Sequence, residues 1–393
     1  MHLAPTERQQ RLRAELRTYF ARLMPDGPPL GASAAEQRVL LRRIGADGLL
    51  GLGWPVEYGG RGRGPDEQFV FFDEAYRAGA PVSMVTLNTV GPTLMKYGTA
   101  EQKAYFLPRI LSGELVFAIG YSEPEAGTDL ASLRTKAVRD EGGAGGGEAW
   151  LIDGQKVFTS NAQNADWIWL ACRTDPNAPK HKGISIILVP TDAPGFSWTP
   201  IETVGGLTTT ATYYDGIRVP VGNLVGEENA GWGLITNQLN HERVALAAIG
   251  MQAEDFYDAA LTYACTPDPV TGERRVDHHW VKAKLAEAHA RLAVNRLLSW
   301  RLVGDVGAGG LAPGDASGVK FAGTESAVET YRMCQEIVGD AGLVRGGSPG
   351  AFGGGELERM NRAAQINTFG GGVSEVQREI VATMRLGMKR GKR

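Results

Sequence analysis

The sequence predicts an α+β multidomain fold in which helices, a sheet and further helices follow one another along the chain. Three observations support this. The chain has 393 residues, too many for one compact core. Apolar residues recur at steps of three and four in its first and last thirds. Between them, short β-branched and aromatic runs are separated by Gly, Asp and Pro. We expect boundaries at residues 1–115, 116–222 and 223–393.

The N-terminal domain is expected to be helical from Thr6 to about Leu115. One helix start is clear, because Thr99 followed by Gln102 forms a capping-box pattern. In that pattern each side chain satisfies the backbone donor of the other residue. A helix should therefore run from Thr99 toward Pro108.

The central domain has the composition of strands. Residues 167–172 and 184–189 are apolar enough to be buried strands, and the glycines at 142–147 suit a hairpin connection. Asp153-Gly154 is a dipeptide typical of tight turns. No GxGxxG sequence opens a helix within a βαβ unit, so a Rossmann nucleotide site is unsupported.

The first C-terminal helix should carry an apolar stripe made of Trp232, Ile235, Leu239, Leu246 and Ile249. Glu242 lies inside this stripe, and Arg243 lies at its margin. A carboxylate on an apolar face must be paired, desolvated or functional, since an isolated buried charge costs several kcal/mol. One interpretation is a buried ion pair or packing contact. The other is a general base whose pKa is raised by its surroundings. Periodicity does not choose between them.

Two further segments could bind a ligand. Residues 121–129 follow the apolar run 116–119 and supply hydroxyls and backbone donors, although such a cluster is also typical of a plain turn. Residues 369–377 place three glycines before Ser374 and Gln377, which have the spacing of a capping box. Helix N-termini preceded by glycines bind anions and cofactors, but a simple cap is equally consistent.

Composition excludes several classes of protein. The formal net charge of −3, with interspersed signs, argues against a nucleic-acid binder. Cys172, Cys265 and Cys334 follow no metal-ligand or CxxC spacing, so we expect no metal site and no disulfide framework. The N-terminus lacks the apolar core of a signal peptide, and no membrane-spanning apolar stretch occurs. We therefore expect a soluble cytoplasmic protein.

Three stretches, taken together and in this order, resemble the acyl-CoA dehydrogenase family over nearly the whole chain. They are residues 117–129, 152–161 and 370–378. The resemblance implies a helical N-terminal domain, a central β-barrel-like domain and a C-terminal four-helix bundle. FAD would lie between the sheet and the bundle.

The resemblance also implies four groups of cofactor-binding residues. They are Tyr121, Ser122, Gly127 and Thr128; Phe158 and Ser160; Gln335 and Gly339; and Gly371, Gly372 and Glu375. Hydroxyls of the first group should face the isoalloxazine and the substrate. The second group should stack on the flavin and hydrogen-bond to it. The third should touch the adenine half across a subunit interface, and the fourth should approach FAD near the last helix.

The family places its catalytic base at one of two positions. In the straight-chain branch the base lies just before the last helix, where this chain has Gly371, which cannot abstract a proton. In the isovaleryl and long-chain branches it lies on the first bundle helix, immediately before an arginine, and Glu242-Arg243 matches that arrangement. The resemblance thus implies that Glu242 takes the α-proton while the β-hydrogen leaves as hydride to flavin N5. Arg243 would orient the acyl-CoA or hold the site's geometry, and an electron-transfer flavoprotein would accept the electrons.

A closer resemblance is to actinobacterial subunits of steroid side-chain acyl-CoA dehydrogenases, through residues 239–246 and 368–372. Such enzymes resemble α2β2 assemblies with FAD held between unlike chains. This chain has no Arg-x-x-Phe after Cys265 to clamp the FAD pyrophosphate, and residues 274–276 fit that role poorly. We therefore expect a partner chain to supply the clamp, and a steroid side-chain or other bulky, branched acyl-CoA as the substrate. A non-catalytic partner subunit, a flavin oxidase or monooxygenase, and a scaffolding protein are the alternatives.

Overall fold

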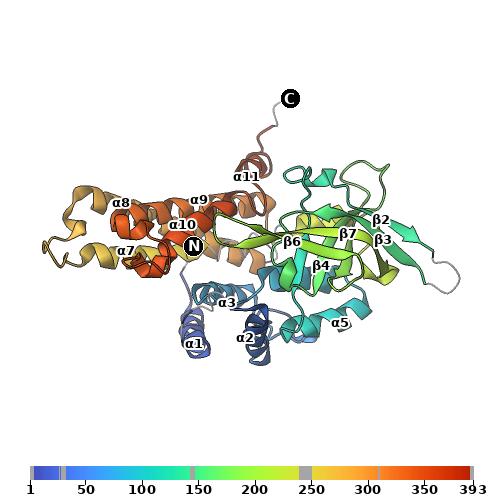
Figure 1. Ribbon diagram of the computed structural model, residues 1–393, viewed down its shortest axis with the longest axis horizontal. Coiled ribbons are helices and arrows are strands. Elements are labelled where there is room, and N and C mark those ends of the chain that lie inside the picture. The colour runs from blue at the N-terminus through green and yellow to red at the C-terminus, as the bar shows by residue number, and fades with distance from the viewer. Residues whose placement is uncertain are drawn as a thin grey trace.

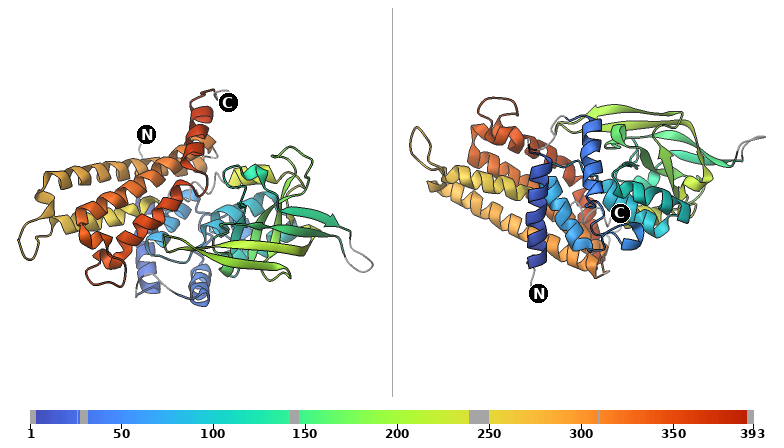
Figure 2. Two further views of the ribbon diagram at one scale, coloured as in Figure 1. Left: turned by 45° about the horizontal axis from the view of Figure 1, so that its top comes forward. Right: turned by 90° about the horizontal axis from the view of Figure 1, so that it is seen from below.

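The computed structural model describes residues 4–25, 27, 32–141, 147–238, 250–308 and 310–389. Helices, a sheet and further helices follow one another, so the predicted α+β multidomain fold is confirmed. In Figure 1 the C-terminal helices lie on the left and the sheet on the right. The N-terminal helices lie below the region where these two parts meet, and Figure 2 shows the same arrangement from two other sides.

The N-terminal helices are α1 (Glu7–Leu23), α2 (Ala34–Ala46), α3 (Pro65–Arg77), α4 (Gly91–Tyr97) and α5 (Ala100–Leu111), with a π-helical stretch, η2 (Val85–Val90), before α4. The capping box at α5 is confirmed: Thr99 Oγ1 accepts from the Gln102 backbone N–H at 3.2 Å, and Gln102 Oε1 accepts from the Thr99 N–H at 3.1 Å. The helix continues past Pro108. On α3, Phe69 makes an edge contact with Trp300 of the C-terminal part, with ring centroids 5.4 Å apart.

The strands are β1 (Phe117–Gly120), β2 (Lys136–Asp140), β3 (Ala149–Lys156), β4 (Trp167–Arg173), β5 (Ile184–Pro190), β6 (Phe196–Glu202), β7 (Thr208–Pro220) and β8 (Leu224–Val225). They form one sheet in the order β6-β7-β3-β2-β4-β5-β8, and β1 pairs in parallel with β4. The expected strands at 167–172 and 184–189 are confirmed as β4 and β5, whose central residues are fully buried. β2 and β3 pair antiparallel, as a hairpin connection requires.

The turn predicted at Asp153-Gly154 is wrong. β3 runs through this dipeptide and pairs with β7 on both sides of it, with a register shift between Ile152 and Gly154. Gly154 has φ +148°, and a Cβ there would lie 2.7 Å from Thr135 Oγ1. The glycine is needed because a bulge brings the backbone close to the neighbouring strand, rather than because the chain reverses.

The described C-terminal helices are α7 (Ala253–Cys265), α8 (His279–Gly307), α9 (Pro313–Val338), α10 (Glu356–Ala364) and α11 (Ser374–Ile380), which continues as a π-helical stretch, η10 (Val381–Arg385). α9 is central and packs against the other four. The capping box predicted at Ser374 and Gln377 is wrong, because Val373 is the N-cap and no side chain caps the helix. The Ser374 hydroxyl instead donates to the Thr368 carbonyl at 3.1 Å.

The three parts share a core. The largest group of buried apolar residues includes Phe71 of α3, Trp169 of β4 and Val303 of α8. A second link is the β6–β7 hairpin, whose tip reaches α10. There Arg362 donates to the Val204 carbonyl. No described helix is long and apolar enough to cross a membrane.

Candidate functional site

The segments that follow β1 and β3 lie against each other, although their residues are more than thirty positions apart. The Val157 N–H donates to the Ser122 carbonyl at 2.9 Å. The Lys156 ammonium donates to the Tyr121 carbonyl at 3.1 Å and to Glu123 Oε1 at 2.8 Å. The fold thus brings the first and second groups of expected cofactor residues together.

A buried ion pair holds this junction. The side chain of Lys156 is 0% exposed and that of Glu123 is 8% exposed. Glu123 also accepts from the backbone N–H groups of Arg134 and Thr135, at 2.7 and 2.8 Å. Desolvation lowers the pKa of Lys156. Desolvation of Glu123 opposes ionisation, but Lys156 and the hydrogen bonds from Thr135 outweigh it and hold the Glu123 pKa below its ordinary value. The carboxylate is therefore ionised and structural rather than a proton acceptor.

Phe158 has a strained backbone and an exposed ring. Its φ is +59°, in the left-handed region, and the residue is 61% exposed. A left-handed backbone costs a residue other than glycine about 1–2 kcal/mol and tends to occur at functional sites. Hydrogen bonds on the next residue hold it: the Thr159 N–H donates to the Thr210 carbonyl at 2.9 Å, and the Thr210 hydroxyl donates to the Thr159 carbonyl. The arrangement keeps an aromatic face open to a planar ligand.

Ser160 and Asn161, which follow Phe158, line a cleft of about 510 Å³ against the N-terminal helices. Across it lie Met84, Val85 and Thr89, at and just before η2. Ser160 Oγ is 3.1 Å from Thr209 Oγ1, within hydrogen-bonding distance. A second cavity of about 240 Å³ shares Gln37, Tyr76 and Pro81 with this cleft, and it extends toward α7 and α10. The total volume suits a ligand of drug size or larger.

Tyr121 is buried, and its hydroxyl is committed to internal hydrogen bonds. It accepts from Trp169 Nε1 at 3.1 Å and donates to Gln238 Oε1. Gln238 is the last described residue of the helix at 231–238 and is fully buried. Its Nε2 has no hydrogen-bond partner within the part of the chain that the structure describes. Tyr121 therefore joins the sheet to the first C-terminal helix.

The other residues of the first group lie nearer the surface. Ser122 is half-buried, while Gly127 and Thr128 are exposed in the loop after β1. Their backbone and hydroxyl donors are thus accessible, as contact with a polar cofactor requires.

The fourth group lies at the start of α11. Gly371 and Gly372 have φ of +66° and +103°. The buried Lys320 of α9 donates to the Gly372 carbonyl at 2.6 Å. The side-chain amide of Gln377 is buried beside Gly372 and finds no hydrogen-bond partner among the described residues. Glu375 is exposed. Two buried side chains that can donate hydrogen bonds, Lys320 and Gln377, therefore lie beside the glycines that precede α11.

The third group lies at the other end of α9. Gln335 Nε2 donates to the Gly342 carbonyl at 3.0 Å, and Gly339, with φ +79°, ends the helix. Gln335 is 15 residues beyond Lys320, which corresponds to about 22 Å along a helix at 1.5 Å per residue. The third and fourth groups therefore cannot contact the same end of a ligand bound to one chain.

Glu242 and Arg243 lie outside the described residues, between Gln238 and Gly250. The structure therefore does not show how they lie relative to the cleft. Among the described residues, no three His, Cys, Asp or Glu side chains are grouped so that they could hold a metal ion.

Comparison with protein-family models matches the three domains of one enzyme family. The N-terminal, middle and C-terminal domain models of acyl-CoA dehydrogenase match residues 6–114, 118–215 and 229–386. The chain belongs to the acyl-CoA dehydrogenase family. Its fold, helical, then sheet, then helical, is that of the family, as the resemblance implied.

Relatives of this acyl-CoA dehydrogenase include two from Mycobacterium tuberculosis. FadE26 is 48% identical with full coverage of both chains, and FadE29 is 48% identical with 99% of each chain covered. The structure is similar to that of the Tcur3481-Tcur3483 steroid ACAD, with a TM-score of 0.90 and 51% identity, and the match covers 100% of both chains. It is similar also to the ChsE4-ChsE5 complex from Mycobacterium tuberculosis, at TM-score 0.90 and 49% identity over both full lengths.

Sequence reasoning missed several residues that organise this acyl-CoA dehydrogenase site. The burial of Lys156 could have been predicted from the sequence. Trp150, Ile152 and Lys156 are separated by even numbers of residues, so the alternation of side chains along a strand places this lysine on the buried face of β3. Gln238 and Lys320 had none, because their roles depend on partners far away in the sequence.

Proposed function

We propose that this chain catalyses the FAD-dependent α,β-dehydrogenation of an acyl-CoA thioester to the trans-2-enoyl-CoA, with Glu242 as the base that removes the α-proton. One observation carries the proposal. In a chain of this family, the strained and exposed Phe158 comes two residues before Ser160, which lines a cleft against the N-terminal helices.

The described residues fit FAD. Phe158 offers an open aromatic face, and Ser160 offers a hydroxyl at the cleft. At the start of α11, Gly371 and Gly372 leave room for close approach, and the buried Gln377 amide has no partner among the described residues. We propose that all four groups of expected residues hold the cofactor, with the adenine half reaching Gln335 and Gly339 from a neighbouring subunit.

In this proposal, different residues of the chain remove the proton and orient the substrate. Bound FAD supplies a hydride acceptor for the hydrogen at the β-carbon. The Glu242 carboxylate takes the proton from the α-carbon, which is acidified by the adjacent thioester. Arg243 orients the acyl-CoA or maintains the geometry around Glu242. Hydrogen bonds to the thioester oxygen stabilise the negative charge that develops as the proton leaves.

We propose a steroid side-chain or other bulky, branched acyl-CoA as the substrate. The cleft of about 510 Å³ and the adjoining cavity of about 240 Å³ share three lining residues, so one extended ligand would span both. A steroid ACAD is among the similar structures.

We propose a hetero-oligomer with a second acyl-CoA dehydrogenase-like chain. Two of the similar structures pair two differently named components. In addition, the arginines nearest to the missing clamp position have partners within this chain. Arg274 pairs with Asp277 at 2.9 Å, and Arg275 donates to the Ile337 carbonyl at 3.3 Å. A partner chain would then supply the clamp. We propose an electron-transfer flavoprotein as the acceptor.

The test is to purify the chain with the product of a neighbouring gene and to follow flavin bleaching as acyl-CoAs of different bulk are added. Glu242→Gln should retain flavin and fail to bleach. The exposed Glu227 provides a matched control, since Glu227→Gln should bleach normally. Normal bleaching by Glu242→Gln would reassign the base. Oxygen uptake that matched the reduction of an artificial acceptor would indicate an oxidase instead.

A further inference from the structure

The cavity of about 240 Å³ lies between the N-terminal and the C-terminal helices, and its lining is mixed in character. Its walls come from the end of α3 and the loop that follows, from the start of α7 and from α10. Apolar surface is supplied by Pro81, Phe256 and Met360, while charged side chains include Arg77, Asp255 and Arg359. Pockets of this kind bind an apolar body that carries a few polar groups.

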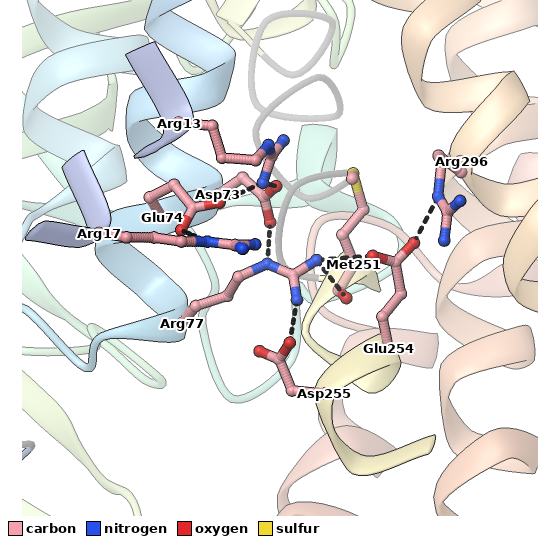
Figure 3. A network of polar contacts seen from close by, with 9 residues as sticks. All are labelled: Arg13, Arg17, Asp73, Glu74, Arg77, Met251, Glu254, Asp255 and Arg296. Carbon is pink, nitrogen blue, oxygen red and sulfur yellow. Dashed lines mark hydrogen bonds and ion pairs between the residues drawn. The ribbon is translucent and has the colours of Figure 1, made fainter. Parts of the chain in front are cut away.

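Arg77, the last residue of α3, is shared by three carboxylates at the wall of this cavity (Figure 3). Its side chain is only 9% exposed. The guanidinium donates to Asp73 Oδ1 at 2.8 Å and to Glu254 Oε2 at 2.8 Å. It also donates to Asp255 Oδ1. One positive charge therefore lies among three negative charges.

Asp255 is the least neutralised of these three carboxylates. Asp73 also pairs with Arg13 of α1, and Glu254 also pairs with Arg296 of α8 at 2.8 Å. Asp255 has no such second arginine within the part of the chain that the structure describes, and there its Oδ2 accepts no hydrogen bond. This carboxylate therefore keeps a capacity to accept a hydrogen bond from a ligand.

The Asp255 carboxylate is accessible, and its ionised form is poorly stabilised. The side chain lines the cavity and is 51% exposed. Desolvation raises its pKa, and the charges of Asp73 and Glu254 add to this effect, so that together they outweigh the opposing effect of Arg77. A hydroxyl group brought by a ligand would stabilise the carboxylate, because hydrogen bonds to an ionised acceptor are the stronger ones.

A neutral hydroxyl suits this position better than an ammonium or a ketone. Arg77 and Arg359 both line the cavity, so a cationic ligand would meet charges of its own sign. Arg359 is held against Glu356 of the same helix by hydrogen bonds of 2.8 to 3.1 Å. A ketone has no proton to donate, so it cannot satisfy the Asp255 carboxylate.

We infer that Asp255 recognises a hydroxyl group at the end of the bulky acyl group that is farthest from the thioester. The inference rests on the proposed function, because it takes the acyl-CoA to occupy the cleft. The cleft and the cavity adjoin, since Gln37, Tyr76 and Pro81 line both. Ser160 lines the cleft, whereas Asp255 lines the cavity. A ligand whose reacting end lies near Ser160 therefore places its far end at Asp255.

The binding of unreactive ligands tests the inference apart from the chemistry. The probes are CoA thioethers that share one four-ring body, in which the ring farthest from sulfur carries a hydroxyl, a ketone or only hydrogen. A thioether lacks the carbonyl that acidifies the α-proton, so no probe can be dehydrogenated. Calorimetry measures the dissociation constants with flavin-loaded protein purified together with the product of the neighbouring gene. The hydroxyl probe should bind about 5- to 15-fold more tightly than the hydrogen probe, the value of one hydrogen bond to a half-exposed charged group.

Asp255→Asn is the discriminating variant. Its amide oxygen can still accept from Arg77, which leaves the amide N–H groups to face the cavity. The preference for the hydroxyl over the ketone should therefore disappear, with a melting temperature near that of the parent. Asp258→Asn is the matched control, since Asp258 is an exposed residue of the same helix and is not among the residues that line the cavity. It should keep the parental preference.

The outcomes separate this inference from the proposed function. Equal binding of all probes by the parent would refute the inference, and so would a lack of measurable binding by any of them. A loss in Asp255→Asn that is the same for every probe would also refute it, because Asp255 would then act only on the structure. Flavin bleaching by the corresponding thioesters without a preference for the hydroxyl refutes the recognition alone. A preference without bleaching refutes the dehydrogenation alone.

Discussion

The hydroxyl of Tyr121 donates a hydrogen bond to Oε1 of Gln238, a residue 117 positions later in the sequence. The same oxygen of Tyr121 accepts from Trp169 Nε1 at 3.1 Å. A single phenol therefore links two strands of the sheet to the first C-terminal helix. Each group in this chain is buried, so each depends on the others for its hydrogen bonds.

Tyr121→Phe should destabilise the fold by about 1–3 kcal/mol, because the indole N–H of Trp169 and the amide of Gln238 would lose a buried partner. Equilibrium unfolding in urea measures this loss. Tyr213→Phe is the control, since the Tyr213 hydroxyl is 3.3 Å from Thr199 Oγ1 on the exposed side of the sheet. Equal stability of the two variants would contradict a structural role for the Tyr121 hydroxyl.

Phe158→Gly should leave the stability of the flavin-free chain within about 1 kcal/mol of the parent. Relief of the left-handed strain offsets the extra freedom of glycine in the unfolded chain, and the exposed ring contributes little burial. Flavin affinity should fall about 2- to 10-fold, the value of one aromatic contact. Flavin fluorescence titration measures it. Phe158→Trp should restore affinity, and unchanged binding by the glycine variant would exclude stacking.

Lys156→Met should destabilise the chain by about 3–5 kcal/mol, because the Glu123 carboxylate would stay buried without its cation. Adding Glu123→Gln should recover part of this loss. The control is Lys136→Met, which removes an exposed pair with Asp153 at 3.5 Å and should cost less than about 0.5 kcal/mol. Similar losses in the two single variants, measured by urea unfolding, would show that burial does not matter here.

The pH dependence of stability should carry a contribution from Glu123. Its pKa in the folded chain lies below the ordinary value of 4.5, so the ionised carboxylate stabilises the fold above that pH. The contribution is lost as pH falls from 4.5 through the folded pKa. Glu123→Gln should therefore flatten the acid side of a plot of unfolding free energy against pH. The pKa of Asp255 is raised, mainly by desolvation, so its contribution to stability changes with pH in the opposite direction. This contribution is the same in the parent and in Glu123→Gln, so it cancels when the two are compared.

Local sequence signals predicted the elements that depend on local interactions. The Thr99 capping box and the buried strands β4 and β5 were confirmed, since a cap is decided within four residues and a buried strand by its own composition. Asp153-Gly154 was misinterpreted because the pairing of β3 with β7 outweighs the local preference of a turn dipeptide. The predicted cap at Ser374 failed because a carbonyl six residues earlier takes its hydroxyl.

The site was predictable only as a set of separate segments. Family likeness identified Ser160 and the glycines before α11, but nothing local shows that Arg77 meets Asp255, a residue 178 positions later. The partners of Tyr121 and Lys156 are similarly distant. Such pairs are products of the assembled fold, so their roles appear only when the helices and the sheet are placed together.

The tip of the β6–β7 hairpin ties the sheet to the C-terminal helices. Gly205 lies so close to α10 that a Cβ there would be 2.8 Å from Ala363 Cα, while on another side of the molecule Phe69 packs against Trp300. The C-terminal helices are therefore joined to the sheet at one place and to the N-terminal helices at another. Any movement of the sheet or of the N-terminal helices relative to the C-terminal helices would have to break one of these contacts.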